Sequence, residues 1–490
     1  MYIKEEVSIM SNTTQALSRI EAILDDSSFV EIGARVTARA TDFNMQEKKA
    51  PSDGVITGYG VVNGNLVYVY SQDASVLGGT IGEMHAKKIA SLYEKAMKMG
   101  APVIGLIDCA GLRLQEATDA LNGFGEIYKN MSLASGIIPQ ITAVYGECGG
   151  GLAVLAELSD FIFVEEKKAK LFVNSPNALD GNYESMLDTS SAKFMAEAGV
   201  VDFVGDEETI ANGVRQLVSM LPSNNAEGTV CTDNQDDLNR VCQDMEAEIA
   251  DPALALTDIS DDGVFVEAKA EYAKEMVTGF ILVDGVTVGA VANRTALYDE
   301  NGEKAEEFAP VLTTAGAYKA AEFVTFCNAF EIPVLTLTNV KGFEATVKSE
   351  RTIAKAAAKL VYAFSNADVP KVNIITGEAY GSAYVAMNSK SIGADMVYAW
   401  PQASIGMMDA SLAAKIMYAD DIAASKDVTS TINEKAAEYA ALQSSVDQAA
   451  ARGYVDTIIN PEDTRKYVVA AFEMLFDKRE VRADKKHGTV

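Results

Sequence analysis

The sequence predicts an α/β protein built from two tandem copies of one domain, and two observations indicate this fold class. Short apolar segments alternate with segments of helical periodicity, which is the pattern of strands covered by helices. Landmarks of the first half also recur in the second half, always 231 residues later. The paired landmarks are Pro102 and Pro333, Pro139 and Pro370, Gly146 and Gly377, and Gly150 and Gly381. Four landmarks in one register are hard to attribute to chance, so we expect an internal repeat.

Each half opens with a β-hairpin. Residues 55–62 and 65–70 are rich in β-branched and aromatic side chains, and the dipeptide Asn63-Gly64 joins them. This combination is a strong signal for two strands connected by a tight turn. The second half shows the same pattern at residues 277–289, with Asp-Gly at the turn. A helix within residues 1–33 is expected ahead of the first hairpin.

A helix and two buried strands follow the first hairpin. Residues 83–99 carry apolar side chains at helical spacing, and Gly100 and Pro102 mark the end of this helix. Residues 102–107 and 137–144 are apolar runs typical of buried strands. Strands and helices that alternate in this way imply a layered α/β arrangement.

The length and one acidic segment predict the domain limits. A chain of 490 residues exceeds one ordinary hydrophobic core. Residues 223–262 are polar and acidic, and we interpret them as the boundary between the halves. We therefore expect an N-terminal domain at residues 11–222, an acidic linker at residues 223–262 and a C-terminal domain at residues 263–490.

The composition excludes several classes of protein. A net charge of −29 argues against nucleic acid as a partner, because phosphate backbones are bound by clustered cations. With 2 histidines in the chain, histidine triads and histidine metal sites have little material, and we expect no metal. The 5 cysteines form no CxxC pair. There is no apolar run of about 18 residues and no signal-peptide pattern, so a reducing cytoplasm is the expected compartment.

The most informative stretch is the glycine-rich turn at residues 146–152, between an apolar strand and a helix-like run. Glycines let a ligand approach backbone N–H groups, and a helix start leaves unpaired N–H donors with a partial positive charge. Both properties suit a developing oxyanion. The alternative is a tight turn that only permits close packing. The second copy of this turn, at residues 377–384, makes two candidate oxyanion sites in one chain.

Three residues have a catalytic interpretation, but a structural role is favoured for each. His85 has no readable acidic partner, so a structural or capping role is favoured over a general base, and a Ser-His-Asp hydrolase is disfavoured. Cys148, inside the first turn, is interpreted as a small buried side chain rather than a nucleophile. Lys98 lies in an Ala-Met-Lys-Met sequence similar to biotin attachment motifs. It closes a well-patterned helix, so we expect no biotin on it.

With these features in view, the chain resembles the biotin-dependent acyl-CoA carboxyltransferases. This family includes the β subunits of propionyl-CoA carboxylases and the α subunits of methylmalonyl-CoA and glutaconyl-CoA decarboxylases. The most specific segments are residues 76–86, VLGGTIGEMHA, and residues 105–116, GLIDCAGLRLQE. Shorter matching segments follow in the order of the family at residues 277–280, 342–343, 398–401 and 452–461.

The resemblance implies two tandem crotonase-like (ClpP/crotonase) domains, with acyl-CoA on the N-terminal side and biotin on the C-terminal side. Gly150 and Gly151 would serve the thioester oxygen. Ser382 and Ala383 would serve the ureido oxygen of biotin, with Gly381 shaping the turn. Other candidate substrate contacts are Gly78, Gly79, Ala110, Gly111 and Arg113. The first four either admit acyl-CoA or only allow close packing, and Arg113 would meet the CoA phosphates.

The resemblance also implies a cofactor and partners. The cofactor is biotin carried on a separate protein, and the substrate is a CoA thioester of the propionyl or methylmalonyl type or another short acyl-CoA. The expected partners are the biotin carrier protein and a biotin carboxylase or a membrane decarboxylase subunit. We also expect a homo-oligomer, from dimer to hexamer.

The chain departs from the family pattern in two shortened segments, residues 179–188 and 344–358, and Ser382 stands where glycine is common. Two other functions therefore stay open. One is crotonase-like chemistry on CoA thioesters without biotin, for which Glu83, Glu116 and Glu147 would be the candidate acids. The other is a non-catalytic assembly subunit, which the shortened segments would suit.

Overall fold

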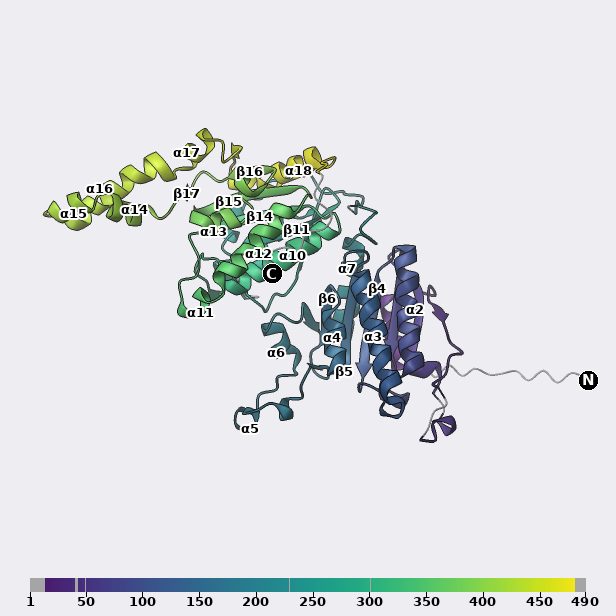
Figure 1. Ribbon diagram of the computed structural model, residues 1–490. Coiled ribbons are helices and arrows are strands. Elements are labelled where there is room, and N and C mark those ends of the chain that lie inside the picture. Colours follow the sequence, from purple (N-terminus) through teal and green to yellow (C-terminus); the bar gives the residue numbers. More distant parts are fainter. Residues whose placement is uncertain (1–13, 40–42, 49, 229, 300, 481–490) are drawn as a thin grey trace, which may run out of the picture. The chain divides into compact units, whose positions relative to one another are not determined.

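The computed structural model describes residues 14–39, 43–48, 50–228, 230–299 and 301–480. The chain divides into two compact units after Asn224. Each unit contains one large sheet with helices packed on it (Figure 1). The predicted α/β fold class, with two copies of one architecture, is confirmed.

The sheet of the first unit has the strand order β1-β2-β3-β4-β5-β6-β8, and β7 pairs with β5. Strands β1 to β3 are antiparallel to one another, and the pairs from β3 onward are parallel. The predicted hairpin is β2 and β3, which turn at Asn63 and Gly64 with positive φ angles. The strands are β1 (Val30–Ile32), β2 (Val55–Val62), β3 (Asn65–Gln72), β4 (Val103–Cys109), β5 (Gln140–Gly149), β6 (Phe161–Glu165), β7 (Lys170–Phe172) and β8 (Phe203–Gly205).

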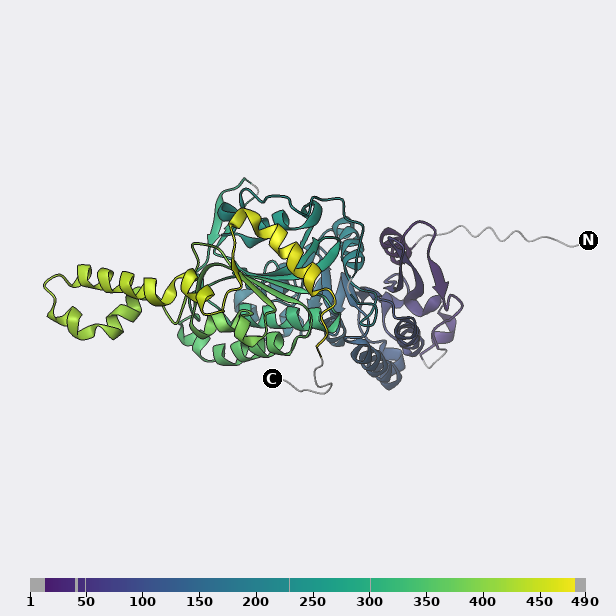
Figure 2. The same ribbon diagram turned by 90° about the horizontal axis from the view of Figure 1, so that it is seen from above.

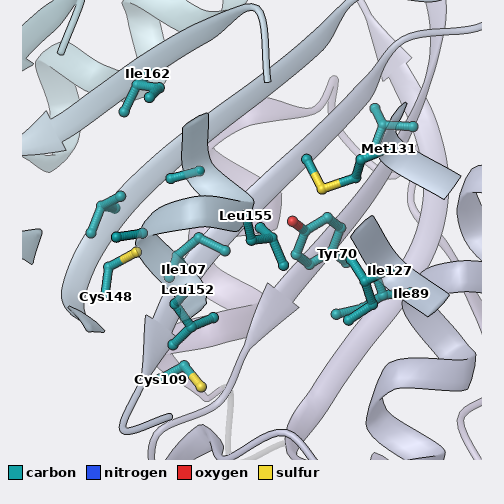
Figure 3. Packing of buried hydrophobic residues seen from close by; sticks show 14 of the residues in the cluster. Tyr70, Ile89, Ile107, Cys109, Ile127, Met131, Cys148, Leu152, Leu155 and Ile162 are labelled. Carbon is teal, nitrogen blue, oxygen red and sulfur yellow. The ribbon is translucent and has the colours of Figure 1, made fainter. Parts of the chain in front are cut away.

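Helices of the first unit connect its parallel strands. The apolar face of the helix predicted at residues 83–99 is buried, with Ile89, Leu92 and Ala96 in the core, and the helix ends at Gly100 with φ +61°. Figure 3 shows Leu152 and Leu155 among the core side chains, near Ile107 and Tyr70. The helices are α1 (Gln15–Ile23), α2 (Glu83–Met99), α3 (Ala117–Ala134), α4 (Gly151–Glu157), α5 (Asn182–Ser185), α6 (Ala192–Glu197) and α7 (Glu207–Met220).

The sheet of the second unit repeats this topology in the order β18-β16-β15-β14-β11-β10-β9, with β17 paired to β15. Its first three strands are again antiparallel and the others parallel. The strands are β9 (Phe265–Glu267), β10 (Met276–Val283), β11 (Val286–Asn293), β14 (Val334–Val340), β15 (Lys371–Tyr380), β16 (Met396–Ala399), β17 (Ser404–Gly406) and β18 (Thr457–Ile458), and the separate pair is β12 (Ala296–Tyr298) and β13 (Lys304–Glu307).

Helices of the second unit include a projecting group, α14 to α16, that extends away from the sheet of this unit in both views (Figure 2). The helices are α8 (Met245–Glu248), α9 (Pro252–Ile259), α10 (Thr314–Ala329), α11 (Val347–Glu350), α12 (Ile353–Asn366), α13 (Gly381–Ala386), α14 (Ala410–Met417), α15 (Ala419–Ala424), α16 (Val428–Tyr439), α17 (Val446–Ala451) and α18 (Thr464–Leu475). Within the described part of the chain, none of the helices combines the length and apolarity needed to cross a membrane.

The segment expected to be an acidic linker belongs to the second unit from Asn225 onward. Met245 of α8 and Leu256 and Ile259 of α9 are buried in the core of that unit. This part of the chain therefore packs as structure and is not an extended connection. Two of the acidic side chains that suggested a linker are compatible with packing because they are paired: Arg465 lies 3.3 Å from Asp236 and 2.6 Å from the buried Asp261.

Candidate functional site

The first glycine-rich turn lies between β5 and α4, as the sequence predicts. Gly150 has φ +64° and ψ −124°. Residues that carry a Cβ atom rarely adopt this backbone conformation, because it is strained for them. A Cβ atom at Gly150 would meet no atom within 4 Å, so this backbone faces open space. Gly146, at the start of the turn, is required for a different reason, because a Cβ atom there would lie 2.0 Å from Oδ1 of Asp108.

The amide groups of this turn are not equivalent. The N–H of Gly150 donates to the carbonyl oxygen of Phe172 in β7 at 2.8 Å. The prediction that the Gly150 amide serves the thioester oxygen is therefore corrected, since β7 already engages it. The N–H groups of Gly151 and Leu152 open α4 and have no acceptor within the helix. They are the better candidates for an oxyanion, and Gly150 shapes the turn.

A cavity of about 540 Å³ adjoins the turn. Its lining comprises Gly111, Leu112, Leu121, Phe124, Gly125, Tyr128 and the three glycines 149–151. The hydroxyl of Tyr128 donates to the carbonyl oxygen of Gly151 at 2.6 Å, and the rings of Phe124 and Tyr128 lie 5.5 Å apart. The cavity is thus apolar on the α3 side and offers backbone groups on the α4 side.

The two other predicted glycine-containing segments run side by side. The N–H of Ala110 donates to the carbonyl of Gly78 at 3.0 Å, and the N–H of Ile81 donates to the carbonyl of Gly111 at 2.9 Å. Gly79 is buried, and a Cβ atom there would lie 2.4 Å from the carbonyl oxygen of Asp108. Packing explains Gly79. Gly111, with φ +107° and open space at its Cβ position, lines the cavity.

Arg113 does not reach the surface, so the prediction that it meets the CoA phosphates is corrected. Its side chain is 1% exposed and pairs with the buried carboxylates of Asp53 and Glu116, the latter at 2.8 Å. It also donates to the carbonyl oxygen of Thr80 at 2.7 Å. Arg113, in the loop after β4, thereby joins two other segments. One is the segment before α2, through Thr80, and the other is the loop before β2, through Asp53.

His85 also lies in this buried region and is fully covered. Its Nδ1 is 2.9 Å from the carbonyl oxygen of Asp53, and its Nε2 is 3.2 Å from the side-chain nitrogen of Gln72. Burial lowers the pKa of His85 to about 3, so the ring is neutral at physiological pH. Burial likewise raises the pKa of the Cys148 thiol. These findings agree with structural roles for both residues.

The second turn occupies the equivalent place between β15 and α13. Gly381 has φ +63°, and a Cβ atom there would lie 3.2 Å from the carbonyl oxygen of Met407. Ser382 is exposed and Ala383 is buried, both in the first turn of α13. Gly377 mirrors Gly146, because a Cβ atom at Gly377 would lie 2.7 Å from Oδ1 of Asn339. The repeat thus reproduces the turn and the side chain packed beneath it.

Sequence reasoning missed Asp53, Phe124 and Tyr128. Asp53 lies in a loop, and only the fold brings it to Arg113. A usable signal existed for α3, where Gly123 and Gly125 interrupt a helical pattern.

Lys98 lies in the last turn of α2, as expected. Among the described residues, no group of three or more histidine, cysteine, aspartate or glutamate side chains is placed to hold a metal ion.

Comparison with known proteins agrees with this geometry. The carboxyl transferase domain family matches residues 11–490. The chain is 40% identical to the methylmalonyl-CoA decarboxylase subunit alpha of Propionigenium modestum, over 98% of this chain and 93% of the relative. It is 38% identical to the propionyl-CoA carboxylase beta chain of Roseobacter denitrificans, over 97% of this chain and 93% of the relative.

A solved structure is similar over nearly the whole chain. The transcarboxylase 12S crystal structure, described as a hexamer assembly with hydrolysed methylmalonyl-coenzyme A bound, has a TM-score of 0.89 and 35% identity. The match covers 96% of this chain and 92% of that one. The predicted crotonase-like, two-domain fold is confirmed by this likeness. From the matching family, the relatives and the shared architecture, we conclude that the chain belongs to the carboxyl transferase domain family.

Proposed function

We propose that this protein moves a carboxyl group between a short acyl-CoA and biotin carried on a separate protein. The observation that carries the proposal is the pair of equivalent turns, each with a glycine at positive φ followed by a helix start. Carboxyl transfer between a thioester and biotin places developing negative charge on one oxygen of each reactant. Two preorganised sets of backbone donors match that requirement.

On the first unit, the amides of Gly151 and Leu152 would hold the thioester oxygen. The hydroxyl of Tyr128 bonds the carbonyl of Gly151, which shares its peptide plane with the N–H of Leu152. This contact fixes the direction of that donor before substrate arrives, and preorganised donors need no rearrangement as charge develops. Because His85 is buried and neutral, it takes no part as a base.

On the second unit, the residues fit the ureido group of biotin. Gly381 leaves a cradle that a Cβ atom would crowd against Met407, and the amides of Ser382 and Ala383 lie in the first turn of α13. When bound, biotin supplies the nitrogen that carries the carboxyl group. Ser382 and Ala383 would orient the ureido oxygen through their N–H groups.

The proposal includes partners of defined chemistry. The substrate class follows the relatives, whose names refer to methylmalonyl-CoA and propionyl-CoA. A biotin carrier protein must deliver biotin, with a biotin carboxylase or a membrane decarboxylase subunit as the further partner. We also propose a homo-oligomer, as for transcarboxylase 12S, whose structure is described as a hexamer assembly.

The test is transfer of the carboxyl group from methylmalonyl-CoA to free biotin, which forms carboxybiotin and releases propionyl-CoA, measured with the purified chain and with two pairs of variants. Gly151→Pro removes one N–H donor at a helix position that tolerates proline. Gly151→Ala keeps the N–H and places the same Cβ atom 2.8 Å from the Tyr128 hydroxyl, so the two variants differ in the donor and share this contact. We expect the proline variant to lose about 10²- to 10³-fold in kcat relative to the alanine variant. Ser382→Pro and Ser382→Ala form the matched pair for the biotin side.

Three outcomes would contradict the proposal. The first is no exchange with any short acyl-CoA. The second is turnover of the acyl-CoA at the same rate without biotin, which would favour other crotonase-like chemistry. The third is equal activity of the proline and alanine variants, which would show that these amides do not hold a reacting oxygen. An acyl-CoA that neither reacts nor shifts thermal stability would favour a non-catalytic assembly subunit.

A further inference from the structure

We propose that a group of exposed cations between the end of β14 and the first turn of α12 is the docking surface for the biotin carrier protein, and that the carrier meets it with carboxylate side chains. This basic surface consists of Lys341, Lys348, Arg351 and Lys355. The inference rests on the proposed function. It adds the place on this chain where the carrier binds and the kind of protein face that this place selects.

The basic surface is a positive region on a strongly acidic chain. Residues 341–355 contain four cations and two carboxylates, Glu344 and Glu350, which gives a local charge of +2 in a chain whose net charge is −29. All four cations are exposed. Within the described part of the chain, their side chains form neither ion pairs nor hydrogen bonds. Their charges are therefore available to a partner.

Stability of the fold does not explain these cations. Lys355 lies in the first turn of α12, and Arg351 lies just before this helix. The N-terminal end of a helix favours negative charge, so both cations are at the unfavourable end. Lys348 adds a third like charge to the same short segment, and like charges repel one another. Binding of an anionic partner accounts for the cations better than folding does.

The first unit lacks this charge at the equivalent positions. The offset of 231 residues that relates the two halves holds on both sides of this region. The positions equivalent to the basic surface are all apolar, namely Ala110, Ala117, Ala120 and Phe124. The positive charge is thus a property of the second unit and not of the repeated architecture.

The basic surface adjoins the turn that is proposed to hold biotin. Strands β14 and β15 are parallel neighbours, and Val340 at the end of β14 pairs with Ala379 in that turn. Lys341 is the next residue after Val340, so the basic surface begins beside the turn. Helix α11 packs on α12, and α12 packs on α13, whose first turn contains Ser382 (Figure 1). A protein that delivers biotin to Ser382 must come close to the basic surface.

A protein face fits this surface better than the phosphates of CoA do. Val347 lies among the cations in the chain and is 82% exposed. An apolar contact with a charged rim is typical of protein interfaces, whereas a phosphate gains nothing from an exposed valine. A carrier must also bind and leave in every cycle. Attraction between opposite charges raises the association rate, which suits such a partner.

The experiment uses two synthetic peptides of equal length with a central biotinyl-lysine, one flanked by glutamates and the other by glutamines. Transfer of the carboxyl group from methylmalonyl-CoA to each peptide and to free biotin is measured as release of propionyl-CoA. The test variant combines Lys348→Gln, Arg351→Gln and Lys355→Gln, and it leaves Lys341 beside the turn unchanged. The control variant removes the same charge from three exposed lysines of the first unit, Lys167, Lys168 and Lys193.

We expect the wild type to prefer the glutamate peptide about tenfold in kcat/KM at about 20 mM salt, and by less than about threefold at about 0.5 M salt, because salt screens exposed charges. The test variant should lose most of this preference at low salt, and the control variant should keep it. Transfer to free biotin serves as the reference. The melting temperature of the test variant should be unchanged or raised, since its cations repel one another.

Several results would overturn the inference. One is a wild type that does not distinguish the two peptides, and another is a preference lowered equally in the test and control variants. A raised KM for methylmalonyl-CoA in the test variant alone would assign the cations to CoA phosphates. A change in the molecular mass of the test variant in solution, measured by light scattering, would assign them to an interface between copies of this chain.

Failure of the proposed function gives a different result. If the wild-type chain transfers no carboxyl group from methylmalonyl-CoA to free biotin or to either peptide, the carboxyltransferase proposal fails and this inference fails with it. If the wild-type chain carboxylates free biotin and both peptides equally well, the inference alone fails.

Discussion

Helices α2 and α10 begin at equivalent places in the two units and are built differently. In both, the segment before the helix pairs with the loop after the next strand, through the parallel bridges Ile81 to Leu112 and Leu312 to Phe343. These residues are 231 positions apart in each case. The backbone of the repeat is therefore the same at this point, and the difference lies in how the helix start is satisfied.

The start of α10 is capped by a residue next to it in the sequence, whereas the start of α2 is capped by carboxylates from segments about 30 residues away in the sequence. Oγ1 of Thr313 accepts from the N–H of Gly316 at 2.9 Å. In α2 the equivalent residue is Gly82, which has no side chain to offer. Instead Oδ2 of Asp53 accepts from the N–H of His85 at 2.7 Å.

A second carboxylate completes the ionic cap of α2. Oε2 of Glu116 accepts from the N–H of Glu83 at 2.6 Å, and Arg113 pairs with both carboxylates. A Cβ atom at Gly82 would lie 2.4 Å from Nη1 of Arg113, so the cluster itself excludes a capping side chain there. One backbone thus tolerates two ways of capping the same helix start. The ionic one joins three chain segments, including the loop that carries Gly111 to the cavity.

The largest expected effect comes from removing the arginine of this cluster. Arg113→Met leaves two carboxylates buried and unpaired, and we expect a loss of about 3–5 kcal/mol in the free energy of unfolding. Urea titration followed by fluorescence measures it. Glu344, at the equivalent position of the second unit, is the control, and Glu344→Ala should change stability by about 0.5 kcal/mol or less. Equal losses for the two variants would contradict an ionic cap peculiar to α2.

A smaller effect is expected from crowding the same cluster. Gly82→Ala introduces no backbone strain, since φ is −105°, but its Cβ atom would press on Arg113 and Glu116. We expect a loss of about 1–3 kcal/mol, measured by the same titration. A neutral or stabilising result would mean that the cluster can move aside at no cost. Combining the change with Arg113→Met should relieve the crowding, so the two losses should not add.

The local cap of α10 should contribute about 1 kcal/mol. Thr313→Ala removes the acceptor for the N–H of Gly316 and should lower the free energy of unfolding by that amount. Thr313→Ser keeps a hydroxyl at the same position and should restore most of the loss. If serine is as destabilising as alanine, the effect comes from packing of the methyl group and not from capping.

The last comparison concerns two equivalent buried lysines, whose contributions depend on pH. Lys88 in α2 and Lys319 in α10 each donate to backbone carbonyls, such as Ser52 for Lys88 and Tyr272 for Lys319. Burial lowers the pKa of Lys88 to about 8 and that of Lys319 to about 7. Between these values and the ordinary lysine pKa, the unfolded chain binds more protons than the folded chain. The stability of the folded state therefore rises with pH in this range.

The variants Lys88→Met and Lys319→Met remove these pH-dependent contributions. From about pH 7 to about pH 9, the wild type should gain stability relative to each variant, and by about 1 kcal/mol more relative to Lys319→Met. Urea midpoints at several pH values measure the gain. A gain of the same size for both lysines would show that their environments do not differ. No gain over this range would show that both lysines stay charged in the folded state, because the folded and unfolded chains would then bind the same number of protons.

Much of the fold could be predicted from the sequence because the signals are local. Asn63-Gly64 sets a hairpin through its backbone preferences, and periodicity identifies α2. The register of the repeat predicts both glycine-rich turns, and Gly150 and Gly381 have the positive φ angles that such turns require. What local signals misjudged was the segment after residue 223, where α8 and α9 bury apolar residues and the buried Asp261 pairs with Arg465.

The candidate site could be predicted only in part, and the two corrections share one cause. In the sequence, Arg113 suggests a ligand for an anion. In the structure, its side chain is buried and paired with Asp53, 60 residues away in the chain. Gly150 looks like an oxyanion donor, yet β7 engages its N–H. Which donors remain free depends on which acceptors the fold brings close, and spacing along the chain does not encode that.

The sequence by itself determined the repeat, the strand–turn–helix order and the glycines that the two turns need, because chirality and periodicity act on neighbouring residues. The tertiary structure alone decided which groups are left for a ligand. It buried the ion cluster that caps α2, committed the amide of Gly150 to Phe172 and left a cavity beside Gly151 and Gly125. The physical reason is that buried polar groups must find partners, and the partners come from segments that only folding brings together.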